Sequence, residues 1–283
     1  MKRSDFRFAD PLRVRWAEVD MQKVVFNGHY LMYVDTAMGN YWRALALPYE
    51  ETLAALHGDL FVRKSTLEYL APARYDDTLA VGIRFEGAGS SSLRFVAAVF
   101  RGEELLVHGE IVYVWTDAVA RRPAPAPAAL VDIFRAHAEG EPVVTVEVGG
   151  WAQLGREARA IRHAVFVDEQ KIPAELEHDA EDRTALHALA RNRLGLAVGT
   201  GRLLAGTPPR IGRMAVRRDL RGASVGREVL EALVQAAGAR GDGSVMLHSQ
   251  ASAVGFYLRA GFERHGPAFE EAGIVHQEMR RAS

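Results

Sequence analysis

The sequence contains no cysteine in its 283 residues. This absence excludes disulfide bonds, thiolate metal sites and a cysteine nucleophile, and it is typical of proteins of a reducing compartment. The ten histidines are scattered, without the His-Glu-x-x-His spacing of a metal site. We therefore expect no metal centre and a cytoplasmic protein.

An excess of charge of one sign and long apolar runs are also lacking. The net charge is −1 at pH 7, so electrostatics favours neither nucleic acid nor a membrane as a partner. No apolar run is long enough to cross a bilayer, and residues 1–7 lack the apolar core of a signal peptide. What is present is an ordinary globular composition, 48% apolar, in a chain whose length favours two domains.

A lone carboxylate, Asp20, stands one loop ahead of a long amphipathic helix. Asn27-Gly28 is suited to the turn and cap at its start. Apolar residues then follow the helical i, i+3, i+4, i+7 spacing, at Tyr30, Tyr33, Val34, Ala37, Met38, Tyr41, Trp42 and Leu45. A carboxylate facing the free amides of a helix start is suited to attack on, or hydration of, a thioester carbonyl. An Asp before a helix is more often a cap or turn former, so spacing alone leaves both interpretations open.

Beyond this helix the hydrophobic period changes to two, which predicts strands. Together with residues 10–16, the predicted strands are 61–70, 78–85, 92–100 and 105–116, with short helices at 50–57 and 128–137. One long helix with several antiparallel strands predicts an α+β layer, a sheet wrapped on a helix. The alternating Ala-Pro run at 123–127, taken alone, reads as a stiff interdomain linker.

The run Arg15-Trp16-Ala17-Glu18-Val19-Asp20, then Val24-Val25-Phe26-Asn27-Gly28-His29-Tyr30-Leu31, resembles the opening of the hotdog-fold acyl-CoA thioesterases, in the 4-hydroxybenzoyl-CoA thioesterase-like branch. The resemblance implies that Asp20 is the catalytic carboxylate. It also implies that the helix start, at Asn27, His29 and Tyr30, polarises the thioester carbonyl. Gln22-Lys23 stands where many members have Gly.

The same resemblance bears on domain boundaries and assembly. Because the family often ends with an Arg-Pro stretch and a short helix, the linker is expected at 138–142 rather than at the Ala-Pro run. The expected domains are therefore residues 1–139 and 140–283. Hotdog domains pair through their sheets, which implies a homo-oligomer with its active site at a subunit interface.

The second half begins again with a strand at 143–148 and helical spacing from Trp151 to Phe166. Further strands are predicted at 185–191, 194–204, 210–217, 244–248 and 275–279, with a helix at 252–259. Between the third and fourth of these strands, Arg221-Gly222-Ala223-Ser224-Val225-Gly226 opens another helix. A strand feeding a Gly-containing loop at a helix start is a phosphate-binding arrangement. By itself this pattern is matched equally well by a helix C-cap turn.

The surrounding motifs carry a second resemblance. Residues 214–226 resemble the acetyl-CoA pyrophosphate loop of the GNAT N-acetyltransferases, and residues 252–262 resemble that family's last motif. Residues 165–173 and 269–276 are similar to the ElaA-like subgroup. The resemblance implies that Met214 and Val216 hold the pantetheine arm and acetyl oxygen, and that Tyr257 protonates the leaving thiolate. It implies a pyrophosphate loop made of Arg221, Gly222, Ala223, Ser224, Val225 and Gly226.

Two positions depart from the GNAT pattern, and the acceptor base is open. Ser224 stands where the family usually has Gly, and Gln250 where many members have Asn. Tyr257 is also explained as a core tyrosine of its helix. The amine must lose a proton, and the candidate acceptors are Glu169, which the motif ranks first, then His178, His248, Glu270 and His276.

The sequence thus predicts a fused α+β protein, a hotdog domain followed by a GNAT α/β domain with a mixed sheet. Its predicted activities are acyl-CoA thioester hydrolysis and acetyl transfer from acetyl-CoA to an amine. Acyl-CoA and acetyl-CoA enter as substrates, and no cofactor is bound permanently. Three alternatives stay open. The first half could be a hydratase or dehydratase, a branch that typically uses an Asp–His or Glu–His pair. Either half could be a non-catalytic CoA-binding module, or the protein could be a dimerisation domain joined to one enzyme.

Overall fold

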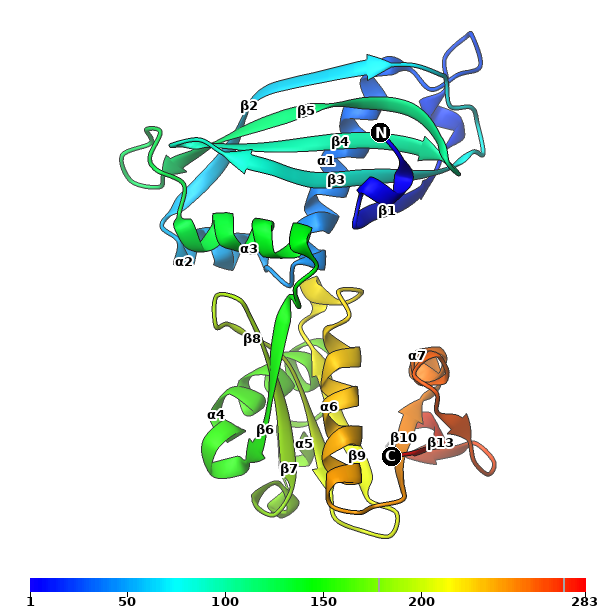
Figure 1. Ribbon diagram of the computed structural model, residues 1–283. Helices are drawn as coiled ribbons and strands as arrows, with labels where there is room; N and C mark the ends of the chain where they lie inside the picture. Colours follow the sequence, from blue (N-terminus) through cyan, green and yellow to red (C-terminus); the bar gives the residue numbers. More distant parts are fainter. Residues whose placement is uncertain (178, 272) are drawn as a thin grey trace. The chain divides into compact units, whose positions relative to one another are not determined.

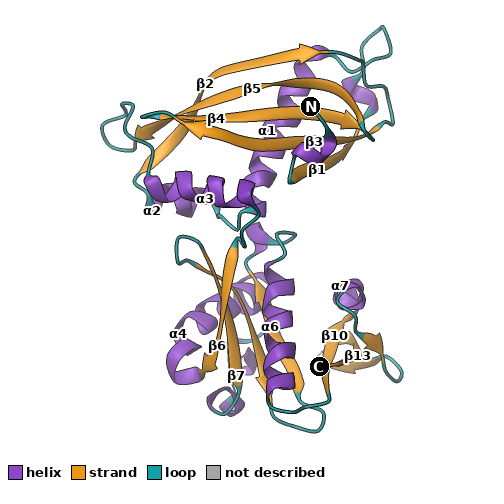
Figure 2. Cartoon of the chain, in the orientation of Figure 1, coloured by secondary structure: helices purple, strands orange, loops and turns teal. Residues whose placement is uncertain are grey.

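The computed structural model describes residues 1–177, 179–271 and 273–283, and the chain forms two compact units, Met1–Val143 and Val144–Ser283 (Figure 1). Each unit has its own sheet (Figure 2). The division falls just beyond the expected linker at 138–142.

The first unit is a five-stranded antiparallel sheet that curves around one long helix (Figure 1). Its strands lie in the order β1-β3-β4-β5-β2, with bounds β1 Phe8–Arg13, β2 Gly58–Tyr69, β3 Thr78–Ala88, β4 Ser92–Arg101 and β5 Glu104–Asp117. Its helices are α1 Asn27–Ala44, α2 Tyr49–Ala55 and α3 Ala128–Glu139. The predicted sheet wrapped on a helix is confirmed.

The core of this unit is aromatic and is centred on α1. The fully buried Tyr41 of α1 meets Phe95 of β4 edge-on at 6.1 Å between ring centroids. It also stacks on Phe134 of α3 at 6.0 Å. Each such ring contributes roughly 1.5–3 kcal/mol through burial. The helical stripe read from the sequence therefore faces the sheet, as its period predicted.

The Ala-Pro run lies within the first unit. Pro123 forms a bridge with Thr116 of β5, and the N–H of Ala126 donates to Ser90 at 2.9 Å. These bonds fold the run back along the sheet and lead it into α3. The interpretation of this run as a linker, which its composition alone suggests, is wrong because its backbone groups are paired with the sheet.

The second unit is an eight-stranded mixed sheet, with the main path β11-β13-β10-β9-β8-β7-β6 and β12 paired to β13. Its strands are β6 Val144–Gly150, β7 Leu186–Asn192, β8 Ala197–Leu204, β9 Arg210–Val216, β10 Ser244–Gln250, β11 Glu263–Arg264, β12 Phe269–Glu271 and β13 Ile274–Ala282. Its helices are α4 Trp151–Arg162, α5 Ala174–Glu177, α6 Val225–Ala239 and α7 Val254–Arg259. The predicted mixed sheet is confirmed.

Among the described residues, the only parallel pairing along this path is between β9 and β10, and it is short. The two strands are in register at Met246↔Arg210 and Leu247↔Ile211. Beyond these pairs, the end of β9 leads to α6 and the end of β10 leads to α7. The strands therefore open a gap where both helices begin, a usual place for a ligand in open α/β sheets.

Some predicted elements are corrected at their ends. The strand expected at 10–16 stops at Arg13, and a 3₁₀ turn, η2 Trp16–Glu18, follows because Glu18 bonds back to Arg15. The helix expected to reach Phe166 is α-helical only to Arg162 and continues as a π-helix, η3 His163–Glu169. Short α5, β11 and β12 are too brief to leave a periodic signal.

Candidate functional site

Asp20 lies in a tight turn that the backbone closes on itself. Val19 and Val25 form a β-bridge across the turn, and the Asp20 N–H donates to Val24 at 2.9 Å. The carboxylate of Asp20 accepts the Gln22 N–H at 2.8 Å and is half-buried. Because one carboxylate accepts several hydrogen bonds, Asp20 keeps capacity for a water or a substrate.

Lys23 takes a left-handed conformation in this turn, with φ of 62°. Glycine adopts this region without a steric penalty, whereas a residue with a Cβ pays roughly 1–2 kcal/mol. The turn therefore has the shape expected of a glycine-containing loop although Gln22-Lys23 supplies no glycine.

Glu18 anchors the turn, and sequence analysis missed it. Its buried carboxylate accepts the Tyr33 hydroxyl at 2.7 Å and both the backbone N–H and Nε of Arg15 at 2.7 Å. Burial works against its charge, but these hydrogen bonds outweigh burial and hold the pKa of Glu18 below its ordinary value. The sequence feature that could have indicated its role is an acidic residue two positions before Asp20.

The start of α1 is fixed to the same turn. The Phe26 N–H donates to the Glu18 carbonyl at 2.9 Å, and Tyr69 donates its hydroxyl to the Asn27 carbonyl at 3.2 Å. The first amides of a helix have no carbonyl partner within it. The structure thus joins the Asp20 turn and the helix start into one hydrogen-bonded segment.

Tyr30 and His29 have different surroundings. The buried Tyr30 hydroxyl accepts the Ala73 N–H at 2.9 Å, so this side chain anchors the segment at Ala73. The His29 N–H donates to the Phe26 carbonyl at 2.9 Å. The Nδ1 of His29 is a buried atom without a hydrogen-bond partner among the described residues. That atom is therefore not paired with Asp20, which removes one geometry of the Asp–His pair of a hydratase.

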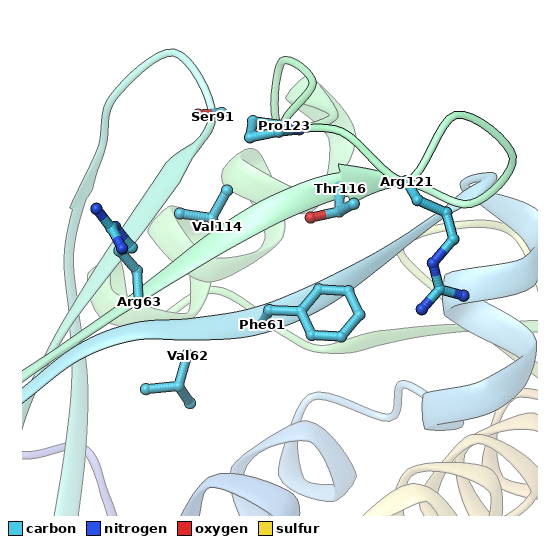
Figure 3. A pocket seen from close by; sticks show the side chains of 8 residues that line it. All are labelled: Phe61, Val62, Arg63, Ser91, Val114, Thr116, Arg121 and Pro123. Atoms are coloured by element: carbon cyan, nitrogen blue, oxygen red, sulfur yellow. The ribbon is translucent and has the colours of Figure 1, made fainter.

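A separate cavity of about 500 Å³ lies on β2 and β5 of this unit (Figure 3). Its lining residues are Phe61, Val62, Arg63, Ser91, Val114, Thr116, Arg121 and Pro123. None of the predicted catalytic or oxyanion residues lines it. Figure 3 shows the Phe61 ring and Thr116 between Arg63 at one end and Arg121 at the other.

In the second unit, one cavity of about 520 Å³ gathers most of the predicted cofactor residues. The predicted residues in its lining are Met214, Val216, Arg221, Gly222, Ser224, Val225, Gly226 and Tyr257. Ala223 is buried and is not among the lining residues. Strand β9, the start of α6 and the helix α7 therefore meet around one space.

The loop before α6 turns through two left-handed residues. Gly222 has φ of 90°, and Ser224, the N-cap of α6, has φ of 64° and ψ of −6°. The Ser224 carbonyl accepts the N–H groups of Arg227 and Glu228 at 2.9 and 3.1 Å. The amides before them lie at the positive end of a helix that spans 15 residues, a favourable place for a diphosphate.

Tyr257 is both a core residue and a cavity residue. Its ring packs against Phe256 at 4.9 Å and Phe262 at 5.8 Å, and 8% of its surface is exposed. Burial raises the pKa of Tyr257 to about 12. Its hydroxyl is therefore protonated at neutral pH and available as a donor.

Glu169 is engaged by the predicted cofactor loop. Its two carboxylate oxygens accept from the two terminal nitrogens of Arg221 at 2.6 and 2.7 Å. This hydrogen-bonded pair holds the pKa of Glu169 below its ordinary value. Its neighbour Gln170 accepts from Gln250 at the end of β10, at 3.4 Å.

Three other proposed proton acceptors, His248, Glu270 and His276, lie on the C-terminal strands. The ring of His248 lies 4.8 Å from that of Phe269, and the Nδ1 of His276 lies 2.8 Å from the carbonyl oxygen of Ile274. Glu270 is exposed on β12. His178 lies outside the described residues.

A buried ionic network beneath the loop that contains α5 also went unpredicted. The guanidinium of Arg162, 1% exposed, bonds Glu177 and takes both oxygens of Asp182 at 2.8 and 3.1 Å. Arg202 reaches the same Asp182 at 2.7 Å. These charges come from segments far apart in sequence, so no local spacing reveals their pairing.

Among residues 1–177, 179–271 and 273–283, no group of His, Asp or Glu is arranged to hold a metal ion. Within the same ranges, no helix combines the length and apolar character needed to cross a membrane.

Comparison with known families gives one match in each unit. The model of the thioesterase-like superfamily matches residues 14–134, and that of the acetyltransferase (GNAT) domain matches residues 151–283. The chain therefore carries a thioesterase-like domain at 14–134 and a GNAT acetyltransferase domain at 151–283, one in each unit. The fold that each motif predicted, hotdog thioesterase-like and then GNAT, is confirmed.

Individual relatives align with one domain or the other. The acyl-CoA thioester hydrolase YbgC of Escherichia coli is 29% identical, over 45% of this chain and 96% of its own length. The uncharacterized N-acetyltransferase YjcF of Bacillus subtilis is 31% identical, over 44% of this chain and 91% of its own length. A solved Thermus thermophilus thioesterase, complexed with coenzyme A and zinc, is 32% identical over 49% of this chain and 98% of its own, with a TM-score of 0.42.

Proposed function

We propose that the protein is a bifunctional CoA-dependent enzyme. The thioesterase-like domain hydrolyses acyl-CoA thioesters, and the GNAT domain transfers acetyl from acetyl-CoA to an amine. The observation that carries the proposal is the cavity where the Arg221–Gly226 loop, the end of β9 and Tyr257 meet. Membership of the two families and the printed name of YbgC support it.

In the acetyl transfer, the amides at the start of α6 bind the diphosphate of acetyl-CoA. The strand backbone at Met214 and Val216 holds the pantetheine arm and the acetyl oxygen. The amine nitrogen attacks the acetyl carbonyl, the new C–N bond forms and the C–S bond breaks. Tyr257 gives its proton to the departing thiolate, and the amine proton passes to water or a base. No acyl-enzyme forms.

In the hydrolysis, Asp20 acts as general base on a water or as nucleophile on the thioester carbon. Amides at the start of α1, near Asn27, His29 and Tyr30, stabilise the developing oxyanion. The C–S bond then breaks, which releases a carboxylic acid and CoA. The hydrogen bonds that fix the Asp20 turn to α1 support this assignment, because they preorganise both groups.

We further propose that the thioesterase-like domain assembles into a homo-oligomer through β2. This strand ends the sheet and is exposed along most of its length, with Phe61 and Val62 exposed by 46% and 54%. A long edge strand offers unpaired N–H and C=O groups to a second copy. Pairing of two such edges would continue the sheet across the interface.

The test is release of free CoA from a panel of acyl-CoAs, measured with and without amine acceptors. Acceptor-independent release that disappears in Asp20→Ala supports the hydrolase and identifies its acyl class. Acceptor-dependent release from acetyl-CoA supports the transferase. Measurable CoA binding without release by either route would contradict the proposal and leave a CoA-binding module.

A further inference from the structure

One ion pair in the GNAT domain joins segments that lie 52 residues apart. Glu169 ends η3, and Arg221 begins the turn that leads into α6. The fork of Arg221 meets both oxygens of Glu169 at 2.6 and 2.7 Å, and its Nε donates to the Val216 carbonyl at 3.3 Å. One guanidinium therefore links the end of β9, the cofactor loop and η3.

The geometry of this pair is stronger than that of an ordinary surface contact. The side chains of Arg221 and Glu169 are 43% and 28% exposed, so water screens their charges. However, two parallel charge-assisted hydrogen bonds fix both distance and direction. The next residue, Gln170, accepts from Gln250 at 3.4 Å. Glu169 thus reaches the end of β9 through Arg221, and Gln170 reaches the end of β10.

This arrangement conflicts with a role for Glu169 as the acceptor of the amine proton. A general base needs a free lone pair directed at its proton and a pKa near the working pH. Each oxygen of Glu169 already accepts a charge-assisted hydrogen bond from Arg221, so the carboxylate faces that guanidinium, and the pair also holds the pKa of the carboxyl low. The pair instead fixes the position of the Arg221 side chain.

We propose that Glu169 is a positioning residue that acts through Arg221. It holds the turn at Arg221–Gly226 in the conformation that receives the diphosphate of acetyl-CoA. This inference rests on the proposed acetyl transfer and deepens it, because it assigns Glu169 to cofactor binding rather than to proton transfer. Loss of Glu169 then weakens acetyl-CoA binding and leaves the chemical step intact.

The experiment compares Glu169→Gln, Arg221→Gln and the double variant in the full-length protein. In Glu169→Gln, the Kd and KM for acetyl-CoA rise about five- to tenfold, while kcat stays within about twofold. The acidic limb of the kcat pH profile is unchanged. The double variant binds acetyl-CoA no more weakly than Arg221→Gln, because Glu169 acts through that residue.

Glu157→Gln is the matched control. Glu157 of α4 makes a comparable two-pronged pair with Arg191, at 30% and 28% exposure, and does not line the cavity. Loss of this ion pair in Glu157→Gln is expected to leave the Kd for acetyl-CoA unchanged. Glu169→Asp, which keeps the charge, restores part of the affinity that Glu169→Gln loses.

Two results would overturn the inference. A fall in kcat of about a hundredfold in Glu169→Gln, with loss of the acidic limb, would make Glu169 the proton acceptor. An unchanged Kd and KM would deny it any role at the loop. If the wild-type protein acetylates no amine, the proposed function fails, but calorimetry with acetyl-CoA still decides whether Glu169 supports the loop.

Discussion

At the scale of single residues, two of the non-glycine residues with a left-handed backbone lie at the candidate sites. Lys23 in the Asp20 turn has φ of 62°, and Ser224 at the N-cap of α6 has φ of 64°. At or next to each, the resembling families commonly carry glycine. The backbone path has therefore been kept while the residue that adopts it most readily is absent, at a cost of roughly 1–2 kcal/mol per site.

Substitution of Ser224 separates backbone strain from the role of its side chain. Ser224→Gly relieves the strain but raises the conformational entropy of the unfolded chain. Because these effects oppose each other, the free energy of unfolding changes by less than about 0.5 kcal/mol. Ser224→Val, with a β-branched side chain at positive φ, loses about 1–2 kcal/mol. Chemical denaturation measures both. Equal stability of the glycine and valine variants would contradict the strain argument.

The glycine variant also tests the cofactor loop. Ser224→Gly removes the side chain where the backbone must approach the diphosphate, so acetyl-CoA is expected to bind a few-fold more tightly. Calorimetry gives this ratio. Weaker binding by the glycine variant would show that the serine hydroxyl itself contacts the ligand.

Tyr257→Phe removes the proposed proton donor and keeps the ring that packs on Phe256 and Phe262. We expect kcat for acetyl transfer to fall about a hundredfold, with little change in the KM for acetyl-CoA. Because the pKa of Tyr257 is about 12, its proton is present throughout the neutral range and is lost only as pH rises towards 12. Full activity in Tyr257→Phe would leave this residue a core tyrosine only.

At the scale of elements, α3 shows how packing decides the behaviour of a titratable group. His137 lies in its last turn, buried, with its ring 5.2 Å from that of Tyr41. Burial, aided by the charge of Arg7, lowers the pKa of His137 to about 4. The folded state therefore holds this imidazole neutral where the unfolded chain would protonate it.

This difference makes the first unit sensitive to acid. The contribution of His137 is fully present above its unfolded pKa of about 6.5 and is lost as pH falls towards 4, by as much as roughly 3 kcal/mol. His137→Leu, which cannot titrate, flattens that dependence. Denaturant titrations of both proteins at several pH values measure it. An identical slope in the variant would mean that other groups cause the loss.

The loop that contains α5 depends on the buried charges of Arg162, Arg202 and Asp182. Asp182 is 3% exposed, and hydrogen bonds from both arginines outweigh its burial and hold its pKa low. Asp182→Ala leaves two buried cations short of a partner, so we expect a loss of about 3–5 kcal/mol in the free energy of unfolding. Calorimetric or denaturant unfolding measures it.

Glu181 provides the matched control for that variant. It is the adjacent acidic residue, with a side chain 57% exposed and no closer than 3.7 Å to Arg202. Glu181→Ala is expected to change stability by less than about 0.5 kcal/mol. Comparable losses in both variants would show that the network is not the source of stability.

At the scale of the whole molecule, each unit has its own sheet and core. The sheet of the first unit has the exposed strand β2 at one edge. Val62→Lys places a charge on that edge, which natural sheets use to prevent pairing. We expect the variant to be monomeric by light scattering and to lose most thioester hydrolysis, while acetyl transfer continues. Val119→Lys changes a loop residue that is 93% exposed and leaves assembly intact. A monomeric wild-type protein would contradict the interface.

The sequence by itself determined the longer elements and their order. The helical period of α1, the strand periods and the motifs around Asp20 and Arg221–Gly226 are local patterns, and local backbone preference and burial follow from them directly. Only the tertiary structure decided the fork between Glu169 and Arg221, the Glu18–Tyr33 bond and the charges around Asp182. Those contacts join residues 15 to 52 positions apart, and nothing in a local pattern specifies which distant partner a side chain meets once the chain has folded.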